Sequence, residues 1–250
     1  MRYFIWFSYD GTRYHGWQLQ PNGDTVQAQL ERGLSLLLRS DVSVTGAGRT
    51  DTGVHARQMA AHFDVESLPS TPEDLTHRLN GVLPYDIAVH RIEAVSPDMH
   101  ARFSATSRTY YYYVHTRKNP FLRQYSLELH YHLDYALMNR AALLLLDHDD
   151  FGAFCKAGSD VKTTLCHVTA AEWHQTSPDT WYFEITANRF LRNMVRAVVG
   201  TLVEVGRHRM TLDEFRHVIA SGRRTKAGES MPAHALFLER VEYGPPISHS

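Results

Sequence analysis

The sequence predicts an α+β protein in which the element order β-α-β-β-α-β occurs twice. Three observations support this fold class. Apolar runs typical of strands alternate with segments that carry leucine at helical spacing. Turns rich in glycine, proline and aspartate separate them. The second part of the chain repeats the order of the first, although no repeat is visible residue by residue.

The first part of the chain accounts for one complete unit. An apolar strand over 2–9 is followed by a helix that begins near Asp24, a good N-cap. A short extended run at 42–45 leads into a glycine-rich stretch, and a strand follows over 58–65. A helix over 72–79, capped by Thr71, and a strand over 87–92 complete the unit. We place the boundary near 103–107, which gives halves of 1–104 and 105–250.

The second part repeats this order. A strand over 107–115 holds four consecutive tyrosines, and an amphipathic helix covers 134–146. Strands over 168–173 and 181–185 flank the turn 177–179. A helix over 189–205 ends at Gly206, and another runs from the capping box of Thr211 and Glu214 to Gly222. A last strand covers 235–241. Two such units predict two ferredoxin-like halves.

Composition excludes several classes of protein. No apolar run approaches the ~18 residues of a membrane span, and the N-terminus is too quickly polar for a secretory segment. With only two cysteines, a disulfide framework is not implied. The 16 histidines show no metal-binding spacing, and Cys-x-x-Cys is absent from the sequence. We therefore expect a soluble cytoplasmic protein with no metal site.

The distribution of charge is more informative than the net charge of -1. The segment from position 189 to position 226 contains nine basic and three acidic residues, so its net charge is +6. Only four of the 26 basic residues of the chain are lysines, and arginine is the side chain that binds phosphate bidentately and stacks on bases. The segment is either a solvated basic face or a surface for nucleic acid.

Two patterns place this chemistry on particular elements. In the helix over 189–205, Arg189, Arg192 and Arg196 share one face, which Gly200 continues. Glycine costs a helix roughly 1 kcal/mol, so we expect another backbone or a ligand to approach closely there. In the strand over 107–115, Arg108, Tyr110 and Tyr112 point to one face and the other two tyrosines to the opposite one. One set is expected in the core, and the other can present rings to a base.

The stretch Gly46-Ala47-Gly48-Arg49-Thr50-Asp51-Thr52-Gly53-Val54-His55-Ala56 places a carboxylate between glycines. Gly48 and Gly53 permit left-handed torsions or close approach of a ligand. Asp51 there suits a nucleophile, a general base or a simple turn cap, and the pattern alone does not choose among them.

Together these residues resemble the tRNA pseudouridine synthase A family. The stretch 46–56 is similar to the family's signature, and further matches follow in order over the whole chain. They are Tyr9-Asp10-Gly11, Tyr14-His15-Gly16-Trp17-Gln18, His100-Ala101-Arg102-Phe103-Ser104-Ala105, Arg189-Phe190-Leu191-Arg192-Asn193-Met194-Val195-Arg196 with Gly200, and Leu236 to Tyr243. The chain departs from the family at Thr109 and Tyr111, where members often carry basic residues.

The resemblance implies a fold, a reaction and a set of roles. It implies two ferredoxin-like halves that share a continuous, mainly antiparallel sheet, with helices on one side and a central active-site cleft. It also implies a homodimer that isomerises uridine to pseudouridine at positions 38, 39 and 40 of the tRNA anticodon stem-loop, without cofactor or metal. By motif position, Asp51 is the catalytic carboxylate and Arg196 its partner. Tyr110 stacks on the target base and helps remove its C5 proton. Leu236 packs on that base, and Arg49 fills the space of the flipped nucleotide.

Four further arginines are candidates for RNA binding, namely Arg102, Arg108, Arg189 and Arg192. The alternative function is a non-catalytic RNA-binding module on the same fold. A third, a phosphate-handling enzyme that uses 46–53 as an anion loop, lacks the lysine such loops carry.

Overall fold

The computed structural model describes residues 1–159 and 161–244, which form two compact units. Of the described residues, the first unit comprises Met1–Thr106 together with Leu238 to Gly244, and the second comprises those between Ser107 and Phe237. Nine strands and five α-helices lie within the described residues, and most of the strand pairs are antiparallel. The predicted α+β class is therefore confirmed.

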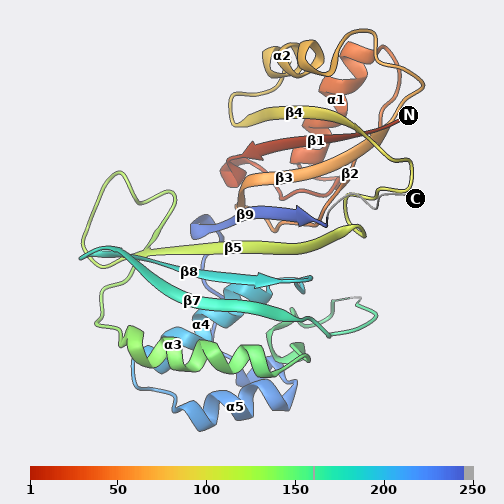
Figure 1. The fold of residues 1–250 in the computed structure, drawn as a ribbon. Coiled ribbons are helices and arrows are strands. Elements are labelled where there is room, and N and C mark those ends of the chain that lie inside the picture. Colours follow the sequence, from red (N-terminus) through yellow and green to blue (C-terminus); the bar gives the residue numbers. More distant parts are fainter. Residues whose placement is uncertain (160, 245–250) are drawn as a thin grey trace. The chain divides into compact units, whose positions relative to one another are not determined.

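The first unit is a sheet with two helices. Its elements are β1 (Arg2–Tyr9), α1 (Val26–Leu38), β2 (Thr45–Gly46), β3 (His55–Asp64), α2 (Pro72–Val82) and β4 (Ile87–Val95). β1 lies between β4 and β3 and is antiparallel to both, and β2 pairs with β3 (Figure 1). α1 and α2 meet where Gly33 lies against Leu79. β1 is buried over most of its length, so it forms the centre of this core.

The last strand, β9 (Leu236–Tyr243), contributes most of its residues to the first unit, where it pairs with β3. The Tyr243 ring lies edge-on to Phe4 and Trp6 at 5.1 and 5.5 Å, and its hydroxyl donates to the Ala101 carbonyl. A single boundary near residue 105 misses this return of the chain, because packing across sequence leaves no mark in local composition. The division into 1–104 and 105–250 remains a prediction.

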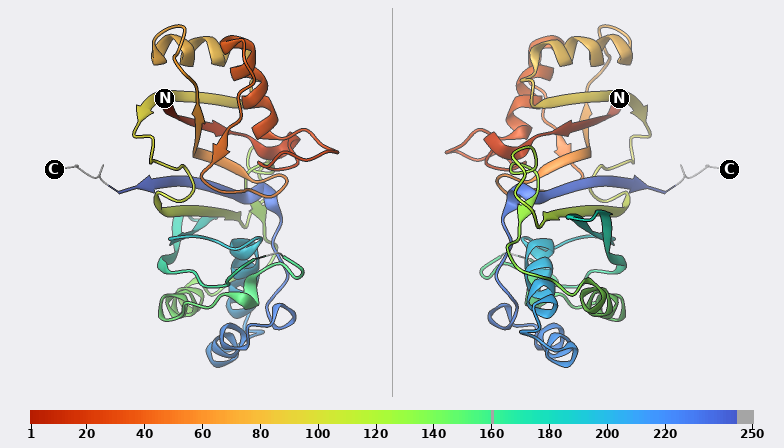
Figure 2. Two further views of the ribbon diagram at one scale, coloured as in Figure 1. Left: turned by 90° about the vertical axis from the view of Figure 1, so that its right-hand side faces the viewer. Right: turned by 90° about the vertical axis from the view of Figure 1, so that its left-hand side faces the viewer.

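The second unit contains β5 (Ala105–His115) from Ser107 onward, β6 (Leu127–Glu128), α3 (Tyr135–Leu143), β7 (Val168–Ser177), β8 (Thr180–Ala187), α4 (Met194–Gly206) and α5 (Leu212–Ser221). β8 pairs antiparallel with both β5 and β7, and β6 is parallel to β5. Tyr112, Phe183 and Trp173 stand opposite one another across these strands and are buried. The three helices pack together, with α3 also on β7 (Figures 1 and 2).

Most element limits agree with the sequence, and two start signals do not. The N-cap of α1 is Thr25, whose side chain accepts from the Ala28 amide, while Asp24 instead binds Arg32. The helix predicted over 189–205 begins only at Met194, because Asn193 adopts a left-handed φ of 66° that ends the preceding turn. The predicted arginine face is therefore wrong: Arg189 and Arg192 precede the helix, and Arg196 alone of the three lies on it.

None of the helices formed by the described residues is both long and apolar enough to cross a membrane. Within the same residues, no three His, Cys, Asp or Glu side chains are grouped so that they could hold a metal ion. Cys155 and Cys166 are buried free thiols, and burial raises the pKa of Cys166 to about 11.

Candidate active site

Asp51 lies on a tight turn between β2 and β3 in the first unit. The Val54 amide donates to the Asp51 carbonyl at 3.1 Å, and Gly53 takes a φ of 77° that side chains other than glycine rarely adopt. Thr50 is buried, whereas Asp51 is half-buried and Arg49 is exposed. Arg49 and Asp51 are therefore both more exposed than the residue between them. A β-carbon on Gly48 would meet no described atom within 4 Å, so the backbone on this side is open.

The Asp51 turn is held by the segment that follows β1. The Thr50 hydroxyl is bonded to the Tyr9 hydroxyl at 2.8 Å, and the Thr50 carbonyl accepts from the Trp17 amide at 3.2 Å. Gly16, at a φ of 89°, lies so close that a β-carbon would come 2.5 Å from the Thr50 carbonyl. Gly46 is packed in the same way against the Trp17 indole. On this side, contacts with the Thr50 backbone and with the Trp17 side chain leave no room for a side chain at Gly16 or Gly46.

Polar groups fix the other side of this segment. Gly11 lies against the Val54 carbonyl, and its amide is 3.0 Å from Nδ1 of the buried His55. The Asp10 carboxylate is also 3.0 Å from His55 Nδ1. The Tyr14 hydroxyl donates to the buried Asp86 carboxylate. Burial first, and then this hydrogen bond, raise the pKa of Tyr14. Residues 9–11 and 14–18, which resemble motifs of the family named above, therefore support the Asp51 turn.

Arg49 also bonds within this unit. Its Nε donates to the Gln18 side-chain oxygen at 3.1 Å. Asp51 and Arg49 therefore both depend on the segment Tyr9–Gln18, and the structure brings these two predicted site residues together. The residue types of that segment do not by themselves indicate a supporting role. Its two glycines at 11 and 16, set among aromatic residues, are the sequence signal of a close backbone contact.

In the second unit, Tyr110 lies on the predicted face of β5. Its ring is edge-on to Phe190 at 5.0 Å, Arg108 donates to the Asn188 carbonyl at 2.7 Å, and Tyr112 donates to the Pro232 carbonyl at 2.9 Å. Tyr110 and Tyr112 therefore have other partners than Tyr111 and Tyr113, which both contact Tyr182, as the predicted alternation requires. Of the four consecutive tyrosines, Tyr112 is the one in the core, because its side chain is fully buried. Burial also raises the pKa of Tyr112. Tyr111 and Tyr113 form a separate aromatic cluster with Tyr182.

Arg196 is tied to a strap formed by residues 227–232. Its Nε donates to the Met231 carbonyl, and the Met231 amide donates back to the Arg196 carbonyl at 3.1 Å. One turn later, a β-carbon on Gly200 would lie 1.8 Å from the Glu229 carbonyl. The expected close approach is confirmed, and the approaching group is the backbone of this strap. Arg196 is half-buried beside it.

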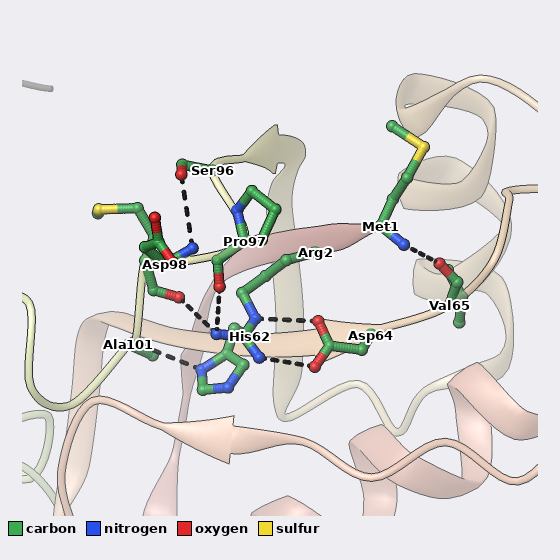
Figure 3. A network of polar contacts seen from close by, with 10 residues as sticks. Met1, Arg2, His62, Asp64, Val65, Ser96, Pro97, Asp98 and Ala101 are labelled. Atoms are coloured by element: carbon green, nitrogen blue, oxygen red, sulfur yellow. Dashed lines mark hydrogen bonds and ion pairs between the residues drawn. The ribbon is translucent and has the colours of Figure 1, made fainter. Parts of the chain in front are cut away.

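The remaining predicted residues lie in several places. Arg189 and Arg192 are in the loop before α4, where the Arg192 carbonyl accepts from the Lys156 amide. Leu236 is buried at the start of β9. Arg102 is exposed in the first unit, on a segment fixed by Arg2 and His62 (Figure 3). Arg2 binds Asp64 with two hydrogen bonds and also donates to the carbonyls of Pro97 and Met99.

The fold and these sites define an α+β protein with a carboxylate on a supported glycine turn in one unit, and with Tyr110 on β5 and Arg196 on α4 in the other. Residues 5–104 and 141–244 match the family model described as tRNA pseudouridine synthase. The chain therefore belongs to the tRNA pseudouridine synthase family, and the resemblance seen in the sequence is confirmed.

Curated relatives agree over almost the whole chain. The tRNA pseudouridine synthase A of Bacteroides fragilis is 54% identical over 242 residues, which cover 97% of this chain and 96% of the relative. That of Bacteroides thetaiotaomicron is 55% identical over 244 residues, covering 97% and 90%. The more distant protein of the same name from Moorella thermoacetica is 42% identical and covers 96% and 98%.

Proposed function

We propose that this chain is a tRNA-uridine isomerase that forms pseudouridine at positions 38, 39 and 40 of the anticodon stem-loop, with Asp51 as the catalytic carboxylate. Membership of the tRNA pseudouridine synthase family supports the reaction and the substrate class. One structural observation carries the assignment of Asp51. A half-buried carboxylate stands on a turn that Tyr9, Trp17 and Gly16 hold in one conformation.

The chemistry suits a carboxylate. The bond from uracil N1 to ribose C1′ breaks, the base rotates, and a bond from C5 to C1′ forms, so N1 gains a proton and C5 loses one. The reaction is a net isomerisation and needs no oxidant or reductant. An ionised Asp51 attacks C1′, removes the 2′ proton or adds to C6 of the base. Each route requires a charged carboxylate held in place, which a supported turn provides.

The other predicted residues take roles around the flipped base. Tyr110 stacks on the uracil and helps remove the C5 proton, and Leu236 packs against the base. Arg196 stabilises the charged form of Asp51. Arg49 occupies the space that the flipped nucleotide leaves, which offsets the few kcal/mol that base flipping costs.

The tRNA backbone is contacted by arginines that the structure places in exposed or half-exposed positions. They are Arg102, Arg108, Arg189 and Arg192. Arg189 and Arg192 precede α4, in a loop rather than on a helix face, so their side chains can follow the phosphates independently. We also propose that the protein is a homodimer and that it works in the cytoplasm, where tRNA is modified. Light scattering tests the homodimer.

Tritium release tests the function directly. With tRNA tritiated at uracil C5, the wild-type protein should release tritium, and Asp51→Asn should abolish release while RNA binding in a filter assay is kept. Asp41→Asn, which removes an exposed aspartate of the same unit, is the matched control and should release tritium normally. Release that persists in Asp51→Asn removes Asp51 from its role. Binding without any release by the wild type favours a non-catalytic RNA-binding module.

A further inference from the structure

The loop that follows the tyrosine strand carries chemistry that the proposed site does not use. It runs from Thr116 to Tyr125 between β5 and β6, in the second unit (Figure 1). The Phe121 side chain, on this loop, is 88% exposed. A large aromatic ring that is left in water is unfavourable unless something covers it. The loop therefore has the character of a contact surface.

The charges of the loop indicate what covers it. Arg117, Lys118 and Arg123 are exposed, and no acidic residue lies between positions 116 and 125. Arg117 pairs with Asp179 at 3.6 Å. Lys118 and Arg123 form no ion pair with any residue that the structure describes. Two uncompensated cations beside an exposed ring fit a polyanion with aromatic bases better than they fit an apolar protein surface.

The loop is held in shape by its own hydrogen bonds. The Thr116 amide donates to the Asp179 carbonyl at 3.0 Å, and the Phe121 amide donates to the Asn119 side chain at 2.9 Å. The Leu122 amide donates to the Asn119 carbonyl, and the Tyr125 amide to the Leu122 carbonyl. The ring is therefore presented on an ordered turn, which lowers the entropy lost when a ligand binds.

An acidic partner distinguishes Arg117 from the other two cations of the loop. Arg117, Lys118 and Asp179 are among the residues that line a hollow of about 150 Å³ at the base of the loop. The Asp179 carboxylate pairs with Arg117, and this pairing disfavours a phosphate beside Arg117. Phosphate contacts are thus assigned to Lys118 and Arg123, on either side of Phe121 along the chain.

From these observations we propose that the loop Thr116–Tyr125 is a second RNA-docking element, in which Phe121 stacks on an unpaired tRNA base and Lys118 and Arg123 bind the flanking phosphates. The inference rests on the proposed function for its partner. Thr116 lies six residues beyond Tyr110 on an extended strand, about 20 Å away. Because the loop begins this far from Tyr110, we expect Phe121 to act on binding rather than on chemistry.

Affinity and kinetics of Phe121 variants test the stacking. Full-length tRNA transcript is used, with dissociation constants measured in the Asp51→Asn background. Phe121→Ala should weaken binding by roughly 5- to 100-fold and raise KM, with kcat unchanged. Phe121→Leu should weaken binding as much as Phe121→Ala, because leucine keeps apolar area but has no ring face. Phe121→Trp keeps a ring and should bind tRNA as tightly as Phe121 does. Leu36→Ala removes an exposed apolar side chain from α1 and should change nothing.

The cations are tested by salt dependence. The binding constant for tRNA falls as the salt concentration rises. The double variant Lys118→Ala with Arg123→Ala should make the slope of log K against log salt less steep by about 1.5. Arg216→Ala is the matched control, because this exposed arginine is already paired with Asp213 at 2.6 Å, and its slope should equal that of the wild type.

Three results would overturn the inference. Unchanged tRNA affinity in Phe121→Ala is one, and wild-type affinity in Phe121→Leu is another. A change in molar mass by light scattering with tRNA binding intact would assign the loop to a second copy of the chain instead. A wild-type protein that releases no tritium contradicts the proposed reaction, while the binding measurements still decide the role of Phe121.

Discussion

At the scale of single residues, polar contacts away from Asp51 also order the first unit. His62 on β3 shows how these contacts depend on protonation. Its ring is buried, and its Nδ1 accepts a hydrogen bond from the Ala101 amide at 3.1 Å. Burial first, and then the positive charge of Arg2, lower the pKa of His62 from 6.5 to about 4. The neutral ring therefore anchors the chain at Ala101 (Figure 3), and Arg102 is the next residue.

This anchor predicts a loss of stability in mild acid. Below pH 6.5 the unfolded chain takes up a proton at His62 while the folded chain does not, until the pH approaches 4. The contribution of His62 is therefore complete above pH 6.5 and is lost as the pH falls toward 4. Between pH 7 and 4.5 we expect the free energy of unfolding to fall by about 2 kcal/mol more in the wild type than in His62→Gln.

Urea unfolding at several pH values measures this difference. Glutamine keeps an oxygen that can accept from the Ala101 amide but has no proton to gain. His90→Gln changes an exposed histidine on β4 and should leave the wild-type pH dependence intact. Equal pH dependence in the wild type and His62→Gln would contradict the assignment.

A second residue-scale prediction concerns Arg196. If it stabilises the charged Asp51, Arg196→Met should lower kcat by about 100-fold or more, because breaking a buried ion pair typically costs ~3–5 kcal/mol. The tRNA dissociation constant should change far less. Single-turnover rates and filter binding separate the two effects. Arg207→Met, an arginine paired with Glu204 at the other end of α4, should leave both unchanged. A loss of affinity as large as the loss of rate would refute the catalytic role of Arg196.

At the scale of elements, the sequence located most helices and strands because their apolar spacing is local. The capping box of Thr211 and Glu214 and the left-handed Gly222 limit α5 as expected. The start of α4 could not be predicted in this way. Asparagine adopts left-handed torsions more readily than most residues, but its presence alone does not fix where a helix begins. In the structure the Asn193 side chain donates to Ser230, 37 residues further along the chain, and local sequence does not reveal that contact. Helix limits set by tertiary contacts are therefore missed.

Gly200 gives a prediction about α4. In a helix, glycine to alanine normally gains about 1 kcal/mol. At Gly200 the added carbon would lie 1.8 Å from the Glu229 carbonyl, so the strap that binds Arg196 must move. Gly200→Ala should lower the free energy of unfolding by a few kcal/mol and reduce tritium release. Gly81→Ala in α2, where no described atom lies within 4 Å, should instead stabilise the protein by up to ~1 kcal/mol. Thermal unfolding of the pair distinguishes the two cases, and similar effects at both sites would contradict the packing argument.

At the scale of the whole molecule, the doubled pattern indicated the fold class and the glycine-rich stretch indicated the carboxylate. Both signals are local. The support of Asp51 by Gly11 and Gly16, the strap over Gly200 and the return of β9 to the first unit join residues far apart in sequence. Local periodicity contains no record of such partners, so their contacts emerge only from the structure.

The return of β9 leads to a prediction for the whole chain. Residues Leu238–Tyr243 complete the first unit, because Leu238 and Val241 are buried and Tyr243 packs on Phe4 and Trp6. A chain ending at Phe237 loses this burial and exposes one edge of β3. We expect amide hydrogens of β1 and β3 to exchange much faster in this chain, while those of β7 and β8 stay protected. A chain ending at Gly244 is the control and should exchange like the full protein. Because burial of the three side chains is worth several kcal/mol, full protection of β1 in the shorter chain would show that the first unit does not need β9.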